Sequence, residues 1–285
     1  MSKNKYCVSL GTPLLCALFI VTSIVISGCS GDSNRAGVTR IQLSGSSTVG
    51  PLAEEIGKRY EKLNPDVRIE VQTGGSSRGI AEAKSGLADI GMSSRALKDS
   101  ETDGRMAWPI AMDGVCFIVH ADNPVSSLSR SQLLSIIKGD VDNWKQFGGA
   151  DESIVFINRA AGRSELELVT KFFDVGAADL NADLVAGENQ QGIKMVATNA
   201  NSICYMSVGA SEDAVSNGEA IKTLPLEGVA ATISNVESGA FPLSRPLIFV
   251  TGDQPSKSLT DFIEFAQSEE VVDLLRELSY VPISK

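Results

Sequence analysis

Residues 67–83 place a turn rich in serine and glycine between a strand-like and a helix-like segment. In the sequence VRIEVQTGGSSRGIAEA, apolar and polar residues alternate at first, and a helix-like run begins at Ile80. The segment from Gly75 to Gly79 matches G-x-S-x-G, the turn that exposes a nucleophilic serine, here Ser77, in one class of hydrolases. The same turn could instead direct backbone N–H groups and hydroxyls at a bound anion.

A serine nucleophile needs a base, and the chain offers few candidates. His120 is the only histidine, and it lies soon after Ser77 at the end of an apparent strand. The hydrolase triad usually places its histidine far downstream. The phosphate-loop pattern G-x-x-x-x-G-K-[ST] is absent. We therefore expect a protein that is not an enzyme, and a serine hydrolase or phosphatase that uses Ser77 is the alternative of another class.

Hydroxyl side chains also follow two other strand-like segments. The region up to residue 94 is predicted to form strand, helix, strand, helix and strand, the alternation of a parallel α/β sheet. The three strand ends carry Ser46-Ser47-Thr48, Ser76-Ser77 and Ser93-Ser94. One such cluster is by default a solvated loop. Because ligands bind beyond the carboxyl ends of such strands, three clusters predict one shared crevice.

A second candidate for anion binding lies at residues 157–169, INRAAGRSELELV. Arg159 leaves a predicted strand, and the residues from Gly162 to Glu165 open a predicted helix whose first N–H groups are unpaired. The planar fork of an arginine matches an oxyanion. A surface salt bridge is the alternative for Arg159. The sequence thus predicts anion ligands in both halves of the chain.

The composition limits the class of ligand. The chain has 285 residues, 43% of them hydrophobic and 21% charged, which is enough for one large domain or two lobes. A net charge of −10 argues against nucleic acid and against an anionic membrane surface as partners. No cysteine or histidine spacing suggests a metal, and no cofactor is expected. Cys116 and Cys204 lie in apolar strand-like runs, where two separate buried thiols are expected rather than a disulfide.

The N-terminal segment indicates export. Residues 1–28 are predicted to be a signal peptide, with a basic start and an apolar segment that is short for a membrane span. The sequence ISGC resembles the bacterial lipobox, which implies that Cys29 is acylated and that residues 29–39 form a lipidated tether. An ordinary signal peptide with an incidental cysteine, or a short anchor, is the alternative. We expect an exported protein, anchored by lipid to the cell membrane and facing the periplasm or exterior.

The segment LSGSSTVGPLAEEIGKRYEKLNPDVRIEVQTGGSSRGIAEAKSGLADIGMSSRAL closely resembles the phosphate-binding protein family of ABC transporters, and the likeness covers nearly all of residues 40–283. The resemblance implies an α/β, two-lobed periplasmic-binding-protein-like fold of type II. Each lobe would be a mostly parallel sheet flanked by helices, with the ligand in the interlobe cleft. Lobe one would comprise residues 40–114 plus 244–285, and lobe two residues 115–243. The implied function is capture of inorganic phosphate, or a similar tetrahedral oxyanion, for delivery to an ABC permease by a monomer.

Together with the strand-end clusters, the resemblance supplies a set of expected oxyanion ligands. The set comprises Ser47, Thr48, Ser76, Ser77, Ser94, Asp113, Arg159, Arg163 and Ser164. At Ser94 some family members carry an aspartate that accepts the ligand's proton. Asp113 could supply that acceptor instead.

The chain departs from the family at one loop. Where the family usually has R-x-x-G-S-G-T, this sequence has R-A-A-G-R-S-E, ending at Glu165. Arg163 could add a second charged fork. We expect Glu165 to turn back and stabilise the start of its helix, because a carboxylate facing a dianion would repel it. Sulfate or another oxyanion, or a sensor or surface role without transport, are the alternatives that this departure leaves open.

Overall fold

The computed structural model describes residues 37–283, which belong to one compact unit. The predicted signal peptide and Cys29 lie outside the described residues. Among the described residues, no helix combines the length and the apolar character needed to cross a membrane.

Strands and helices alternate through most of the described chain. The strands are β1 (Thr39–Gly45), β2 (Val67–Thr73), β3 (Ile90–Ser93), β4 (Arg105–His120), β5 (Val155–Arg159), β6 (Leu184–Ala186), β7 (Ser202–Ser207), β8 (Ile221–Leu224), β9 (Ser244–Gly252) and β10 (Val281–Pro282). The helices are α1 (Val49–Leu63), α2 (Ser76–Ser85), α3 (Arg130–Ile137), α4 (Ser164–Phe173), α5 (Asn189–Ala197), α6 (Val208–Ser216), α7 (Ile233–Glu237), α8 (Lys257–Ala266) and α9 (Val272–Glu277). Short 3₁₀ turns occupy Asp99–Glu101, Trp144–Phe147, Ala177–Asp179 and Glu269–Val271.

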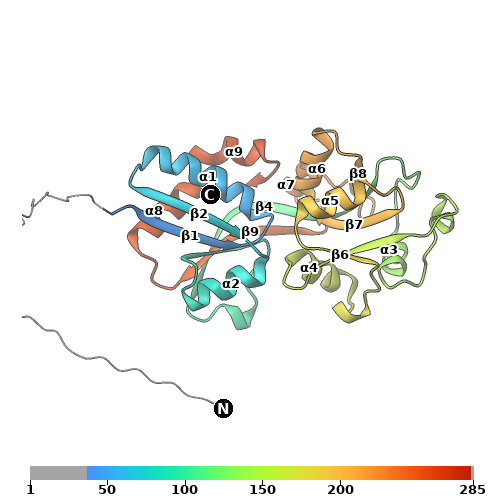
Figure 1. Cartoon of the computed structure of the whole chain (residues 1–285), viewed down its shortest axis with the longest axis horizontal. Helices are drawn as coiled ribbons and strands as arrows, with labels where there is room; N and C mark the ends of the chain where they lie inside the picture. The colour runs from blue at the N-terminus through green and yellow to red at the C-terminus, as the bar shows by residue number, and fades with distance from the viewer. Residues whose placement is uncertain (1–36, 284–285) are drawn as a thin grey trace, which may run out of the picture. The chain divides into compact units, whose positions relative to one another are not determined.

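The strands follow the order β2-β1-β3-β9-β4-β7-β5-β6, and β8 and β10 both pair with β4. Among the described residues, the pairs β1–β2, β1–β3, β5–β6 and β5–β7 are parallel, and every antiparallel pair includes β4 or β9. The α/β class is therefore confirmed, with antiparallel pairing added where these two strands run. Figure 1 shows α1 and α9 on one side of the part of the sheet that contains β1 and β2, and α2 on the other side.

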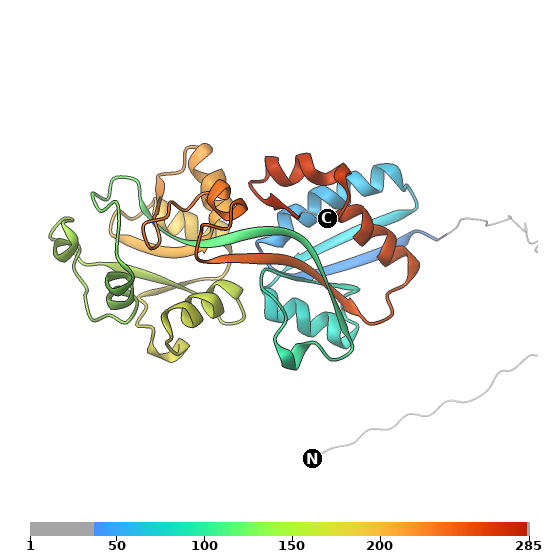
Figure 2. The ribbon, with the colours of Figure 1, turned by 180° about the vertical axis from the view of Figure 1, so that it is seen from behind.

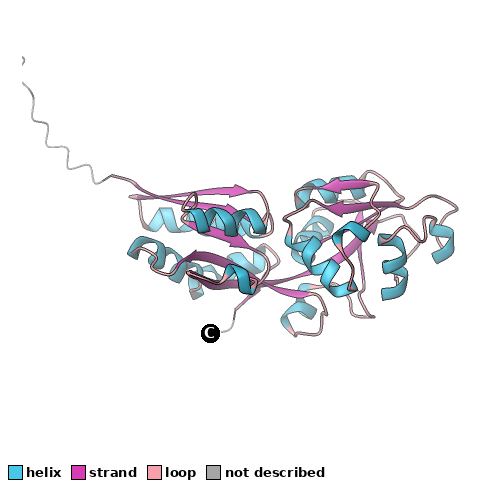
Figure 3. Cartoon of the chain, turned by 90° about the horizontal axis from the view of Figure 1, so that it is seen from below, coloured by secondary structure: helices cyan, strands magenta, loops and turns pink. Residues whose placement is uncertain are grey.

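Two long strands carry the chain between the two halves of the sheet. The 16-residue strand β4 pairs with β9 in its first part and with β7 and β8 in its second part. Figures 2 and 3 show β4 and β9 running together from one half to the other. In this ladder Asp113 lies opposite Arg245, and Gly114 lies opposite Ser244. An acidic and a basic residue therefore lie side by side where β4 and β9 pass between the two halves.

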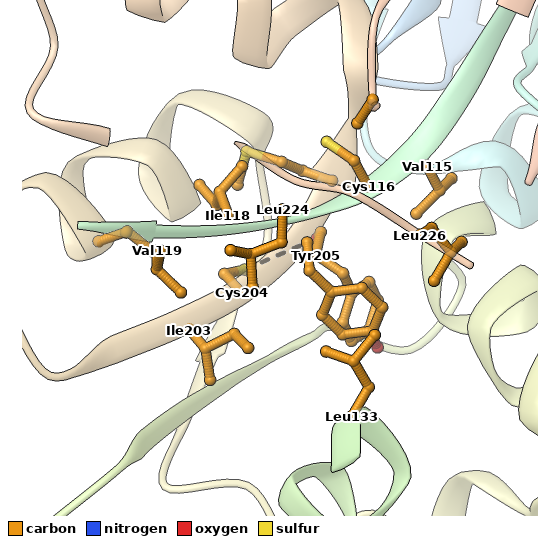
Figure 4. Packing of buried hydrophobic residues seen from close by; sticks show 14 of the residues in the cluster. Val115, Cys116, Ile118, Val119, Leu133, Ile203, Cys204, Tyr205, Leu224 and Leu226 are labelled. Carbon is orange, nitrogen blue, oxygen red and sulfur yellow. Dashed lines mark hydrogen bonds between the residues drawn. The ribbon is translucent and has the colours of Figure 1, made fainter. Parts of the chain in front are cut away.

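Each half has its own hydrophobic core. The first core takes its buried residues from positions 41–111 and 247–280, and we call this half lobe one. The second core takes them from positions 115–243 together with Val281, and we call this half lobe two. Figure 4 shows part of the second core, where β4 and β7 bring Cys116, Cys204 and Tyr205 together with aliphatic side chains. Both cysteines are free thiols, as predicted, and burial raises the pKa of each thiol to about 12.

One face of α1 packs into the core of lobe one. Leu52 and Ile56 are fully buried and Tyr60 nearly so. Leu63, which shares their helical spacing, is 60% exposed. It is the last residue of the helix and lies outside the core cluster. Helical spacing predicts which side of a helix is apolar, but it does not predict which turns of the helix the core covers.

The start of α2 lies tightly against the ends of β1 and β3. A Cβ added at Gly79 would lie 2.7 Å from the Gly45 Cα and 2.8 Å from the Met92 carbonyl oxygen. Backbone atoms at that distance cannot move aside without shifting a strand. The glycine thus allows α2 to place Ser76 beside the other strand ends.

Gly79→Ala is expected to lower the free energy of unfolding by about 1–3 kcal/mol, because overpacking outweighs the gain of up to about 1 kcal/mol in helix propensity. Urea denaturation monitored by circular dichroism measures the change. Gly57→Ala is the matched control, since the nearest atoms to its added Cβ belong to one side chain, that of Ile69, and not to the backbone. Equal stability of the two variants would contradict the steric argument.

Candidate functional site

Polar side chains from both lobes form a buried group where the lobes meet. None of them is more than 5% exposed. We call this group the interlobe cluster, and its members are Ser46, Thr48, Ser76, Ser94, Asp113, Arg159, Ser164, Glu165, Asn189 and Arg245. Buried polar groups at this density must satisfy one another, so their hydrogen bonds define what the site can do.

The three strand ends converge within this cluster, as the sequence predicts. The Ser46 hydroxyl after β1 donates to Ser94 Oγ at 2.9 Å. The Ser76 hydroxyl at the start of α2 accepts from the Ser94 N–H at 3.1 Å. Ser46 also accepts from the Thr48 N–H at 3.1 Å and so helps to cap α1. Since β1 pairs in parallel with both β2 and β3, their carboxyl ends lie at one edge of the sheet.

Arg245 is the centre of the cluster. Its Nη1 donates to Ser164 Oγ at 2.9 Å, to Glu165 Oε1 at 3.0 Å and to Ser94 Oγ at 3.3 Å. Its Nη2 donates to Thr48 Oγ1 at 3.1 Å and to Asp113 Oδ2 at 2.9 Å. The guanidinium therefore links residues of lobe one, lobe two and the crossing strand β4.

Asp113 holds Arg245 in place. Its Oδ2 accepts from Arg245 Nη2 and, at 3.2 Å, from Nε. Its Oδ1 accepts from the Gly209 N–H at 3.1 Å, at the start of α6. Because both oxygens have partners within the protein, the geometry favours a positioning task for Asp113 over the predicted role as acceptor of a ligand's proton.

Glu165 faces the cluster, so the expectation that it turns back along its helix is wrong. Its Oε1 accepts from the Thr48 hydroxyl of lobe one at 3.1 Å and from Arg245 at 3.0 Å. Burial raises the pKa of this carboxyl, but Arg245 and Arg159 outweigh burial and lower it to about 2. The two guanidiniums supply the physical reason for the inward orientation, since they stabilise a carboxylate more than the helix start does.

Arg159 lies deeper in lobe two, at the end of β5. Its Nη1 donates to the Glu188 carbonyl at 2.9 Å, and its Nη2 donates to the Asn189 side-chain oxygen at 3.1 Å. The Asn189 amide in turn donates to Thr48 Oγ1 at 3.2 Å. The Arg159 Nε is buried and has no hydrogen-bond partner within the described residues. Arg159 is therefore a buried positive charge, not the surface salt bridge that was its alternative.

Three predicted ligands lie outside the cluster. Ser77 donates to Glu167 Oε1 at 3.0 Å, and Arg163 donates to Glu188 Oε1 at 2.8 Å. Ser47 is partly exposed and lines a cavity of about 240 Å³ beside the site, together with Asn189. The structure thus places Ser77, Arg163 and Ser47 around the cluster and brings Thr48, Ser76, Ser94, Asp113, Arg159 and Ser164 into it.

A second group of contacts joins the lobes at the rim of the cluster. Glu167 of α4 accepts from the Ser77 hydroxyl and forms ion pairs with Arg95 at 3.0 Å and with Lys98 at 2.6 Å. The Ser77 N–H donates to the Gly162 carbonyl of lobe two at 3.2 Å. These rim contacts surround the cluster, and the Glu167 side chain is 25% exposed.

Sequence reasoning missed three members of the cluster. Arg245 could have been found from the sequence, because it is a charged residue directly before the apolar segment PLIFV and close to the predicted boundary between the lobes. Asn189 and the inward Glu165 have no local pattern of that kind. Their places follow from the pairing of β5 with β6 and from the angle of α4, which only the folded chain defines.

The contacts of Ser77 do not resemble a hydrolase triad. Within residues 37–283, Ser77 makes no hydrogen bond to His120, whose Nδ1 accepts from the Asp122 N–H at 3.1 Å. His120 ends β4 next to β8, far along the sheet from the cluster. The arrangement contains donors directed inward but no nucleophile paired with a histidine base.

Comparisons with known proteins give a consistent family. A sequence model described as the PBP superfamily domain matches residues 30–270. A putative phosphate ABC transporter substrate-binding protein from Clostridium perfringens, solved with bound phosphate, is 31% identical, with a TM-score of 0.80 over 86% of this chain and 100% of that one. An ABC-type phosphate transport receptor from Vibrio cholerae is 30% identical, with a TM-score of 0.70 over 85% of this chain and 100% of that one.

A curated relative agrees over nearly the full length. The phosphate-binding protein PstS of Borreliella burgdorferi is 28% identical over 93% of this chain and 97% of its own length. Its agreement with the two solved structures means that the similarity extends across both lobes and is not confined to one segment.

Asp113→Ala is expected to lower the free energy of unfolding by about 3–5 kcal/mol, because it leaves Arg245 buried with one carboxylate fewer. Asp151→Ala is the control, since the Lys145–Asp151 pair is about two-thirds exposed and should contribute no more than about 1 kcal/mol. Urea denaturation at neutral pH measures both. Similar small losses for the two variants would show that the buried pair does not stabilise the fold.

The ionisation of Glu165 should also appear in the pH dependence of stability. Since its folded pKa of about 2 lies below the ordinary value of 4.5, its carboxylate stabilises the fold above that ordinary value, and the contribution is lost as the pH falls towards 2. The difference in unfolding free energy between wild type and Glu165→Gln should therefore shrink between about pH 5 and pH 2. Denaturation curves across that range measure it, and a constant difference would contradict an ionised Glu165.

Proposed function

Because the chain belongs to the PBP superfamily and, within it, to the family of substrate-binding proteins of phosphate ABC transporters, we propose that it captures inorganic phosphate, or a similar tetrahedral oxyanion, and delivers it to an ABC permease. The observation that carries this proposal is the interlobe cluster. Hydroxyls, arginines and the first turn of α4 converge there from both lobes.

The chemistry of the cluster suits an oxyanion that has lost its water. The hydroxyls of Thr48, Ser94 and Ser164 are small donors that can turn towards a ligand. Arg245 and Arg159 supply positive charge, and the N–H groups at the start of α4 are unpaired within the helix. Together these groups would replace the ligand's hydration shell, and bonds from both lobes would exclude solvent.

The crossing strands suit a hinge between the lobes. Lobe two, residues 115–243, would rotate relative to lobe one about β4 near Gly114 and about the chain near Leu243. Gly114 and Leu243 both lie where the chain passes from one core to the other. An opening of this kind would let the ligand in, since the members of the cluster are buried where the lobes meet.

The proposal extends to location and assembly. The signal-like residues 1–28 and the lipobox-like cysteine, Cys29, support an exported lipoprotein that acts outside the cytoplasm as a monomer. No bond needs to be broken for this function. The inward donors, without a histidine base at Ser77, support binding over hydrolysis.

Another oxyanion is the second candidate. Ser94 supplies a hydroxyl at the position where some family members carry an aspartate, and the oxygens of Asp113 are occupied within the protein. Since neither Ser94 nor Asp113 offers a free carboxylate oxygen, these two positions do not select a protonated oxyanion over a fully ionised one. Sulfate, which has no proton at neutral pH, is therefore the competitor to test.

Calorimetric titration of residues 30–285, refolded from denaturant to remove carried-over ligand, tests the proposal. Phosphate should bind one to one, and Arg159→Gln should weaken binding by roughly tenfold or more because it removes a buried charge. Arg130→Gln is the control, since Arg130 is about half exposed and lies away from the cluster. Binding of sulfate but not phosphate would favour the second candidate. Binding of neither by a folded protein would overturn the transport function.

A further inference from the structure

The carboxylate of Glu165 uses the donors that the proposed function assigns to the oxyanion. We propose that Glu165 is an internal competitor for the ligand: its side chain occupies part of the oxyanion site, helps to join the lobes when no ligand is bound, and lowers the affinity for phosphate. This inference rests on the proposed function. It concerns a residue at which the chain departs from the family pattern, in which a threonine usually stands.

The geometry places one oxygen where a ligand oxygen would be held. Glu165 Oε1 accepts from the Thr48 hydroxyl at 3.1 Å and from Arg245 Nη1 at 3.0 Å. These donors come from lobe one and from the crossing strand β9, whereas Glu165 belongs to α4 in lobe two. The carboxylate therefore bridges the lobes in the way that a bound oxyanion would.

The charges of the cluster already cancel. Its buried cations are Arg159 and Arg245, and its buried anions are Asp113 and Glu165. A phosphate dianion added beside an ionised Glu165 would leave an excess of negative charge in a buried space, which is unfavourable. Without the Glu165 carboxylate the same cluster has an unbalanced positive charge, which an oxyanion would neutralise.

Two consequences follow for ligand binding. The carboxylate must leave Thr48 and Arg245 before an oxyanion can use them, so the binding-competent population is only part of the total and the apparent affinity falls. The contact also favours joined lobes in the absence of an oxyanion. Loss of the contact should therefore both strengthen phosphate binding and loosen the protein that has no oxyanion added.

Glu167 provides a matched control on the same helix. It too is a carboxylate that reaches lobe one, through Ser77, Arg95 and Lys98, but it lies at the partly exposed rim and outside the cluster. Glu167→Gln removes one negative charge close to the site without freeing its donors. The comparison separates occupation of the site from a general change in charge.

The experiment compares wild type, Glu165→Thr, Glu165→Gln and Glu167→Gln as residues 30–285, refolded to remove ligand. Calorimetry should show phosphate binding about tenfold or more tighter in both Glu165 variants and changed by less than about threefold in Glu167→Gln. Small-angle X-ray scattering without oxyanion should show a larger radius of gyration for Glu165→Thr than for wild type. Glu165→Gln keeps the size of the side chain, so it tests the charge without opening a cavity.

Three results would overturn the inference. Weaker or equal phosphate binding by the Glu165 variants would mean that Glu165 contacts the ligand or does not affect it. An equal gain in Glu167→Gln would mean that the effect is only one of charge. If no variant binds phosphate, the proposed function fails and competition with phosphate fails with it. Scattering then decides the remaining part of the inference, because an unchanged radius would show that Glu165 does not hold the lobes together.

Discussion

The pairing of Arg245 with Asp113 is the interaction on which the rest of the site depends. The two residues lie opposite each other on β9 and β4, the strands that join the lobes. Asp113 fixes one side of the guanidinium, and the other side is then free to donate to Thr48, Ser164 and Glu165. A buried charge tolerates little freedom, because each unpaired donor has a large energetic cost. The crossing strands therefore position the site as well as connect the two cores.

The hydroxyl groups add donors without adding charge. Ser46 and Ser76 both bond to Ser94, while Ser94 also lies 2.6 Å from Ser164 of the other lobe. Such a network can redistribute its hydrogen atoms among several acceptors, which suits an anion whose oxygens are equivalent. The charged side chains determine how much negative charge the cluster can accept. The hydroxyl groups determine how its hydrogen-bond donors are arranged. A carboxylate placed within the network, as Glu165 is, lowers the negative charge that the cluster can accept and also uses some of its donors.

The lobes and the linking strands divide the tasks of stability and function. Each lobe has its own apolar core, made of residues other than those of the polar cluster. The cluster lies between those cores, where contacts are polar and reversible. At the rim, the 25% exposed Glu167 side chain pairs with the nearly buried Arg95, so this contact is closer to solvent than those of the cluster. An arrangement of two stable bodies with a polar contact is what a hinged binding protein requires.

The sequence by itself determined the α/β class, the alternation of strands and helices and the convergence of Ser46, Ser76 and Ser94. These features depend on local periodicity and on the rule that parallel strands end at one edge, so neighbouring residues contain the information. The direction of Glu165, the separation of Arg163 from the cluster and the central place of Arg245 were decided only by the tertiary structure. Each depends on charges brought together from positions far apart in the chain, such as Asp113 with Arg245, and no local pattern encodes which buried charges will meet.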